Sequence, residues 1–298
     1  MSSARYSVRH QTRYLYSDAV AISYNRIHCQ PRSCPWQSFS QARLSVDPEP
    51  EFLARQTDFF GNPVSFFTVQ EPHQDLTVTV MFEAVVRART YDHPGESWES
   101  VAERLRVAKE SESLEASGFR FASGWVELSS ELEEFARVSF IPGRPILEAA
   151  TDLCARISKE FTFDPEATTI ATPVREVLRT KRGVCQDFAH LFIGALRSVG
   201  LACRYVSGYI LTVPPPGQER LQGADASHAW VSVWAPPLGW VDLDPTNNLV
   251  VNDQHVTLAW GRDFHDVSPM RGVVVGGGAQ VVKVGVDVVP LSGGLGKS

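Results

Sequence analysis

The sequence contains no apolar segment typical of a membrane helix or of a secretion signal. No run approaches the roughly 18 consecutive apolar residues that a membrane-spanning helix requires. The first residues, MSSARYSVRHQTRYLYSD, also lack the apolar stretch of about 7–15 residues found in signal peptides. The five cysteines are odd in number and form no regular framework, which favours reduced thiols over a disulfide scaffold. We therefore expect a cytoplasmic protein without a membrane partner.

An excess of positive charge is absent as well. The chain carries 28 Lys and Arg against 34 Asp and Glu, a formal net charge of −6. Nucleic acids and anionic membranes attract basic surfaces, so neither is expected as a partner. The chain has 298 residues, 43% of them hydrophobic. It can therefore form one or two domains with hydrophobic cores of usual size, without a disulfide or metal to stabilise them. The oligomeric state does not follow from these numbers.

No internal repeat occurs, and the hydrophobic pattern divides the chain into three parts. Residues 1–90 are β-rich, because segments such as DLTVTVMFEAVVRART alternate apolar and polar residues between turn clusters such as FFGNP. Their spacing predicts a sandwich-like domain. Residues 91–143 form a helical connection, with Ser130 and Glu133 expected as a capping box. Residues 144–298 combine helices with later strands, including two strands at the C-terminal end. This segregation predicts an α+β fold.

One cysteine lies at the start of a predicted helix, in TKRGVCQDFAHLFIGALRSVG (residues 180–200). The helical apolar pattern begins just after Cys185 and ends before Gly200, a typical residue after a helix end. Free N–H groups and the positive end of the helix dipole would stabilise a Cys185 thiolate. Gly183 would permit close backbone approach. A cysteine beside an apolar helix face is more often a buried core residue, so a catalytic role for Cys185 depends on which residues lie near it.

A predicted hairpin, SHAWVSVWAPPLGWVDLDPTN, supplies those partners. Period two places His228, Trp230 and Ser232 on one strand face, with small apolar residues on the face toward a core. If Trp234 pairs with Trp240, Asp244 is the diagonal neighbour of His228, whereas Asp242 lies beyond its direct reach. A nucleophilic cysteine needs a base, and that base needs an acceptor that fixes its tautomer. We hypothesise a site of Cys185, His228 and Asp244.

Metal and cofactor sites are not expected. The segment HCQPRSC (residues 28–34) has a spacing that fits no familiar zinc site. Zinc bound by Cys185, His228 and Asp244 remains a separate hypothesis, because all three are suitable ligand types.

The three motifs GVCQDFAHLFIGALRSVGLACRYVSGY, SHAWVSVW and GWVDLDPTNN resemble, in the same order, the core motifs of the transglutaminase-like superfamily. The flanks resemble those of its bacterial subgroup, through RYSVRHQTRYLYSDAVAISYNRIHCQPR and GRDFHDVSPMRGV. The resemblance implies a papain-like core in which Cys185 is the nucleophile, His228 the base and Asp244 the orienting carboxylate. It implies acyl transfer from a peptide or protein amide through a thioester. Hydrolysis is preferred, and the alternatives are glutamine transamidation and a non-catalytic peptide-binding scaffold.

The remaining site residues are candidates for the oxyanion hole or the cleft: Gln186, Asp187, Trp230 and Asp242. Animal transglutaminases place a tryptophan upstream of the cysteine as an oxyanion donor, but residues 143–184 contain none here. A second oxyanion donor is therefore unassigned. The calcium-binding apparatus of those enzymes is not recognisable either.

Overall fold

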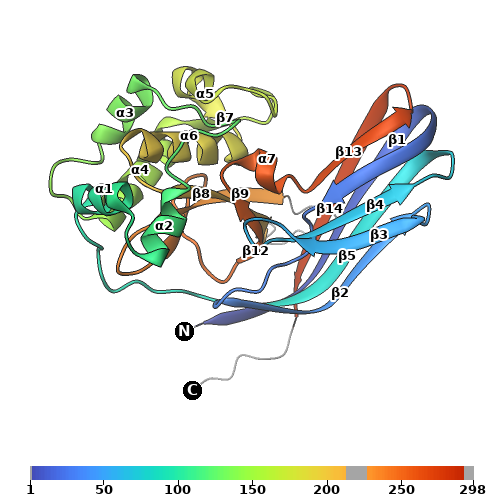
Figure 1. Cartoon of the computed structure of the whole chain (residues 1–298), viewed down its shortest axis with the longest axis horizontal. Helices are drawn as coiled ribbons and strands as arrows, with labels where there is room; N and C mark the ends of the chain where they lie inside the picture. The colour runs from blue at the N-terminus through green and yellow to red at the C-terminus, as the bar shows by residue number, and fades with distance from the viewer. Residues whose placement is uncertain (1, 213–226, 292–298) are drawn as a thin grey trace, which may run out of the picture.

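Two sheets of different size organise the chain (Figure 1). The structure, a computed structural model, describes residues 2–212 and 227–291. The larger sheet has seven strands and lies to one side, while the smaller one has five strands and packs under most of the helices. The predicted α+β class is confirmed.

The larger sheet is built around one long strand, β1 (Ser3–Ile27). The first half of β1 pairs antiparallel with β5 and β14, and its second half pairs with β4 and β13. The strands around it are β2 (Gln37–Asp47), β3 (Phe52–Thr57), β4 (Pro63–Val69), β5 (His73–Arg87), β13 (Met270–Gly276) and β14 (Gln280–Pro290). A buried apolar cluster that includes Val20, Phe67 and Leu76 lies against this sheet.

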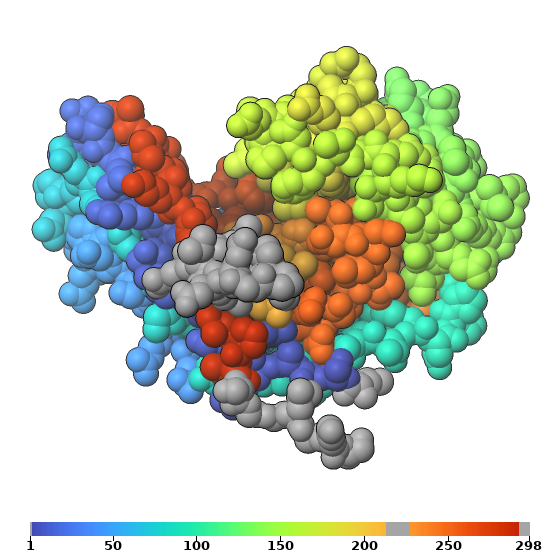
Figure 2. All heavy atoms as spheres, turned by 180° about the vertical axis from the view of Figure 1, so that it is seen from behind, coloured from blue at the N-terminus to red at the C-terminus, as the bar shows by residue number. Residues whose placement is uncertain are grey.

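The two C-terminal strands complete this N-terminal sheet. β13 runs along β1 from Val20↔Gly276 to Ile27↔Met270, and β14 from Tyr6↔Pro290 to Tyr16↔Gln280. Figure 2 shows the red C-terminal segment against the blue N-terminal strand. Their alternating pattern predicted two strands correctly, but the division at residue 144 placed them with the catalytic core. A strand pattern carries no information about its partner, and here the partner is the open edge of β1.

The smaller sheet has the order β11-β10-β9-β8-β12 and carries the histidine and aspartate motifs. Its strands are β8 (Cys203–Ile210), β9 (Ser227–Trp234), β10 (Trp240–Asp244), β11 (Leu249–Val250) and β12 (His255–Gly261), and a separate short pair joins β6 (Thr162–Phe163) to β7 (Arg182–Gly183). The helices are α1 (Trp98–Val107), α2 (Ser111–Ser117), α3 (Ser130–Arg137), α4 (Ile146–Glu160), α5 (Val174–Thr180), α6 (Cys185–Ser198) and α7 (Phe264–Val267). None of these described helices is long and apolar enough to span a membrane.

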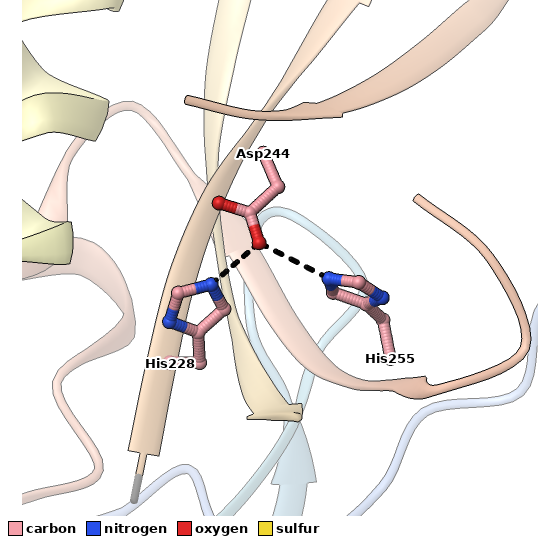
Figure 3. Close-up of side chains that lie close together, drawn as sticks. All are labelled: His228, Asp244 and His255. Atoms are coloured by element: carbon pink, nitrogen blue, oxygen red, sulfur yellow. Dashed lines mark hydrogen bonds and ion pairs between the residues drawn. The ribbon is translucent and has the colours of Figure 1, made fainter. Parts of the chain in front are cut away.

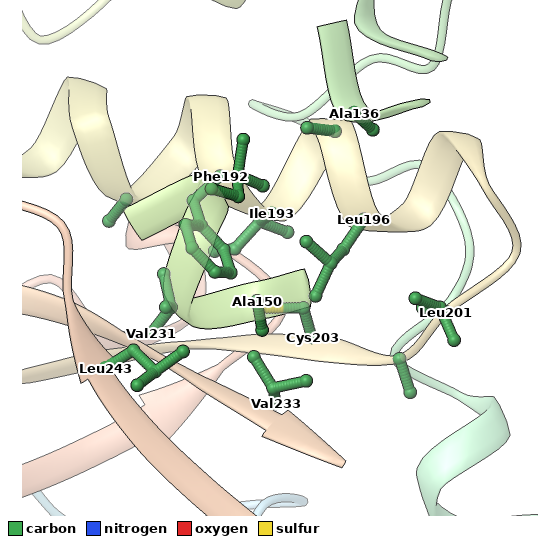
Figure 4. Close-up of a cluster of buried hydrophobic side chains, with 14 of the residues drawn as sticks. Ala136, Ala150, Phe192, Ile193, Leu196, Leu201, Cys203, Val231, Val233 and Leu243 are labelled. Carbon is green, nitrogen blue, oxygen red and sulfur yellow. The ribbon is translucent and has the colours of Figure 1, made fainter. Parts of the chain in front are cut away.

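Helix α6 is held on this sheet by a fully buried apolar layer (Figure 4). Phe192 and Leu196 from the helix lie near Val231 and Val233 of β9, and all four are inaccessible to solvent. These valines form the small apolar face that the period-two pattern assigned to a core. The same alternation turns His228 and Trp230 to the opposite face, so packing and chemistry use different sides of β9.

Two elements differ from the sequence-based expectation. Helix α3 is capped by Ser129, whose hydroxyl accepts the N–H of Leu132, so the helix begins one residue earlier than expected and the capping box of Ser130 and Glu133 is not formed. Both adjacent serines can cap a helix, and only the backbone geometry separates them. Helix α2 was not identified individually, since seven residues are too few to show a helical period.

Gly208 of β8 generates a stability prediction. A Cβ atom at this position would lie 2.2 Å from the Val256 carbonyl oxygen and 2.3 Å from Cη2 of Trp230. Both obstacles are buried, so Gly208→Ala should lower the free energy of unfolding by about 2–3 kcal/mol or more through overpacking. Urea denaturation measures the change, with Gly124→Ala as the control, because nothing lies within 4 Å of a Cβ there. Equal stability of the two variants would contradict the packing described for β8.

Candidate active site

Cys185 is the first residue of α6, as the helix-start prediction requires. The N-cap is Val184, whose N–H donates to Oδ2 of Asp187 at 2.8 Å. The Thr168 hydroxyl donates to the same oxygen at 2.6 Å. A Cβ at Gly183 would lie only 2.8 Å from that oxygen, so the glycine is needed for this cap. Asp187 thus fixes the turn that presents Cys185.

His228 and Asp244 meet on the strand hairpin through the predicted register. Trp240 pairs with Trp234 and Asp242 with Ser232, which makes Asp244 the diagonal neighbour of His228. Nε2–H of His228 donates to Oδ2 of Asp244 at 2.7 Å (Figure 3). His228 is 8% exposed and Asp244 is inaccessible, so little water competes for this bond.

The Asp244 carboxylate is held by several further donors. Its Oδ1 accepts the backbone N–H groups of Thr246 and Asn247 at 3.0 and 3.2 Å. Its Oδ2 also accepts the Asn247 side-chain amide at 2.8 Å and Nε2–H of His255 at 3.2 Å. Burial acts to raise the pKa of Asp244, but the hydrogen bonds from His228 and His255 outweigh it and hold the pKa well below its usual range. Asp244 is therefore ionised at neutral pH.

His228 connects this carboxylate with Cys185. Burial alone would lower the pKa of His228, yet hydrogen bonds with Asp244 and Cys185 raise it to about 10. Because Nε2 is bonded to Asp244, the interaction with the thiol falls to Nδ1. Cys185, His228 and Asp244 thus form a triad. In it, Nδ1 of His228 can exchange a proton with the thiol, while Nε2–H is held as a donor by Asp244.

His190, five residues after Cys185, takes no part in this series. Its Nε2 accepts the backbone N–H of Phe264 at 3.1 Å, and its ring lies against Tyr205. Burial lowers the pKa of His190 to about 4, so the ring is neutral. The helical angle of about 140° between positions 185 and 190 is consistent with this separation.

His255 is the residue near the site that the sequence did not indicate. It begins β12, about 70 residues after Cys185, and its ring is buried beside Asp244 (Figure 3). No motif marks it, because β12 is separated from β10 by two other strands of the sheet. The only available signal was an unexplained histidine at the start of an apolar strand.

The four additional cleft candidates take different positions. Nε2–H of Gln186 donates to the carbonyl of Ile170 at 3.4 Å, and Asp187 is buried in the helix cap. Trp230 is inaccessible, and Asp242 is 1% exposed and paired with Arg89 at 2.7 Å. Trp230 and Asp242 therefore do not line an open cleft. Arg89, in the segment that follows β5, covers that part of the sheet.

A metal ion fits this arrangement poorly. In the described part of the chain, the group of potential ligand atoms within 4.8 Å of one another consists of His228, Asp244 and His255, without Cys185. Both imidazole Nε2 atoms point at Oδ2 of Asp244. Zinc–nitrogen distances are about 2.0–2.1 Å, so an ion bound by His228 would sit almost on the oxygen that lies 2.7 Å away. The geometry is that of hydrogen bonds to a carboxylate.

Comparison with known proteins identifies the family. The bacterial transglutaminase-like N-terminal region matches residues 6–85, and the transglutaminase-like superfamily core matches residues 140–245. An uncharacterized protein of Mycobacterium tuberculosis is 41% identical over 97% of this chain and 94% of its own length. The chain belongs to the transglutaminase-like superfamily. Cys185, His228 and Asp244 all lie within the matched core.

Other members show how far the similarity extends. A candidate cysteine protease from Cytophaga hutchinsonii has the same fold, with a TM-score of 0.77 at 17% identity over 99% of this chain and 93% of that one. A protein-glutamine gamma-glutamyltransferase of Pseudomonas aeruginosa is 31% identical over 102 residues, which is 32% of this chain and 15% of that protein. The similarity thus extends along the whole chain for one protein and over about a third of the chain for the other.

The raised pKa of His228 predicts a pH-dependent stability. A group that holds its proton more tightly in the folded state stabilises that state below its unfolded pKa of about 6.5. The contribution is lost as pH rises through the folded pKa of about 10. The loss of unfolding free energy caused by His228→Gln should therefore be larger at pH 6 than at pH 10. Urea denaturation at pH 6, 8 and 10 measures it, and a constant difference would contradict the assignment.

Proposed function

We propose that this transglutaminase-like protein cleaves an amide or peptide bond through a Cys185 thioester and transfers the acyl group to water. The observation that carries the proposal is the position of His228, which interacts with Cys185 and with a buried, ionised Asp244. The proposed substrate is a peptide or protein amide, and the proposed location is the cytoplasm.

Acylation uses the thiol and both imidazole nitrogens. Because the raised pKa of His228 already places the proton on Nδ1, the Cys185 thiolate itself forms the bond to the carbonyl carbon. The carbonyl oxygen becomes an oxyanion. When it collapses, the carbon–nitrogen bond breaks, and Nδ1–H of His228 protonates the departing amine. Throughout, Nε2–H of His228 stays hydrogen-bonded to Asp244, which stabilises the imidazolium without taking its proton.

Deacylation repeats these steps with water. Nδ1 of His228 removes a proton from a water molecule, whose oxygen attacks the thioester carbon. The carbon–sulfur bond then breaks, which restores the Cys185 thiolate beside the protonated His228. The products are a carboxylic acid and free enzyme, so the atoms balance without a cofactor.

The oxyanion is assigned to backbone donors at the start of α6. First-turn N–H groups have no acceptor within a helix, and they lie next to the attacking sulfur. The indole N–H groups of the tryptophans at 98 and 125 are engaged elsewhere: Trp98 donates to the Ile141 carbonyl and Trp125 to Nδ1 of His265. We therefore propose the N–H of Cys185 or Gln186 as the principal donor.

Transamidation is the second candidate, supported by the core similarity to the Pseudomonas aeruginosa glutamyltransferase. Both reactions share the thioester and differ in the group that attacks it. A glutamine-containing casein digest with and without a primary amine separates them by mass. Deamidation adds about 1 Da, peptide-bond hydrolysis gives shorter peptides, and transamidation adds the amine. We expect hydrolytic products to dominate even with the amine present.

Catalysis should depend on Cys185 and not on the other accessible cysteine. Cys29, Cys154 and Cys203 are buried, whereas Cys34 and Cys185 are half-buried. Cys185→Ala should lower product formation in the casein assay by at least about 10³-fold, because no thioester can form. Cys34→Ala is the matched control and should retain activity. Equal activity of wild type and Cys185→Ala would refute the proposed nucleophile.

The thiol–imidazole interaction also predicts how fast Cys185 is alkylated. Measured with iodoacetamide in the Cys34→Ala background, the wild-type site should remain reactive down to about pH 5, because His228 stabilises the thiolate. His228→Ala should require a pH near about 8.5, the value for a free cysteine. Peptide mapping by mass spectrometry gives the rate at Cys185. Identical pH profiles in the two proteins would leave only the scaffold function.

A further inference from the structure

A second buried imidazole contacts the carboxylate that orients His228. Oδ2 of Asp244 lies 2.7 Å from Nε2 of His228 and 3.2 Å from Nε2 of His255 (Figure 3). His255 is 1% exposed, so this contact is made away from bulk water. The acceptor atom is the same for both rings, which distinguishes His255 from a histidine that only fills space.

The two nitrogens of the His255 ring each lie near an acceptor oxygen. Oδ1 of Asn252 accepts the backbone N–H of Gln254 at 2.9 Å, so the oxygen of this amide faces the loop. Nδ1 of His255 lies 3.4 Å from that oxygen, while Nε2 lies closer to a charged carboxylate. Since the ionised Asp244 is the stronger acceptor, we assign the ring proton to Nε2.

The sheet provides the space that this contact needs. Gly208 of β8 stands between His228 of β9 and Thr257 of β12, and it has no side chain. The buried Trp230 ring occupies that space, with its centroid 5.3 Å from that of His255 and 6.2 Å from that of His228. The two imidazole centroids are 6.2 Å apart, so the three rings pack together and the two histidines share Asp244.

We propose that His255 is a positioning residue, which acts by holding the Asp244 carboxylate in line with Nε2–H of His228. This inference rests on the proposed function. Five donors converge on the carboxylate, and His255 supplies one of the three on the oxygen that His228 uses. Without it, Oδ2 is restrained on one side only, by Asn247.

Two effects of removing His255 oppose each other. Its N–H draws some charge from Oδ2, which slightly weakens the bond to His228, an effect of about 10–30% for coupled hydrogen bonds. It also restrains the carboxylate, and hydrogen bonds weaken steeply once they bend below about 120–150°. We take the restraint to dominate, so loss of His255 should weaken the hold on His228. Among the described residues, the titratable groups that face His228 are Asp244 from β10, Cys185 from α6 and His255 at the start of β12.

The test uses His255→Leu, which removes the donor, and His255→Gln, which retains an N–H. The readout is the ratio of Cys185 alkylation rates at pH 6 and pH 9, in full-length protein without Cys34. A change that only alters packing or access affects both rates and leaves the ratio unchanged. We expect the ratio to fall roughly threefold to tenfold in His255→Leu, as for a weakened hydrogen bond to a charged group, and to stay near wild type in His255→Gln.

Further variants keep the test decisive if His255→Leu folds poorly. His255→Phe keeps an aromatic ring without an N–H and should lower the same ratio. His73→Leu, at a buried histidine of β5 outside the site, is the control and should not change it. An unchanged or higher ratio in His255→Leu and His255→Phe would overturn the inference, as would an equal loss in His255→Gln. If wild type itself reacts only near pH 8.5, the proposed function fails together with the inference.

Discussion

The candidate site depends on one buried negative charge. Asp244 has no contact with solvent, and a carboxylate in such a place must either bind a proton or be surrounded by donors. Here two backbone N–H groups, one amide and two imidazoles meet it, and they come from the turn after β10 and from strands β9 and β12. The sheet must bring these segments to one point for the charge to persist. The proton-transfer role proposed for His228 depends on that charge.

This constraint also separates the tasks of the two sides of the sheet. The face toward α6 is small and apolar, and it positions the helix and therefore Cys185. The other face carries large and polar side chains, including Trp230 and the Asp242–Arg89 pair, against the N-terminal unit. Cys185 and His228 can meet because one begins a helix and the other lies near the start of a strand. Neither side chain has to pass through the apolar layer between α6 and the smaller sheet.

Local sequence patterns predicted the helix start and the hairpin of the candidate site. Contacts between strands that are distant in sequence could not be predicted. The helix start at Cys185 and the register of Trp234 with Trp240 depend on neighbours within about 20 residues, so the sequence defines them. The contact of His255 with Asp244 depends on the strand order β10-β9-β8-β12, which no periodicity encodes. The same holds for Asp242, whose partner Arg89 lies 153 residues away. The family resemblance supplied the core motifs but not these contacts.

The pairing of β13 and β14 with β1 has a consequence for synthesis on the ribosome. The strand that starts the larger sheet emerges first, and the strands that close its edge emerge about 250 residues later. Until then β1 exposes a row of unpaired backbone groups, while the helices and the smaller sheet can already assemble. The unit that is first in the sequence is thus the last to be completed. A nascent chain of this protein needs protection at one strand edge for nearly the whole time of its translation.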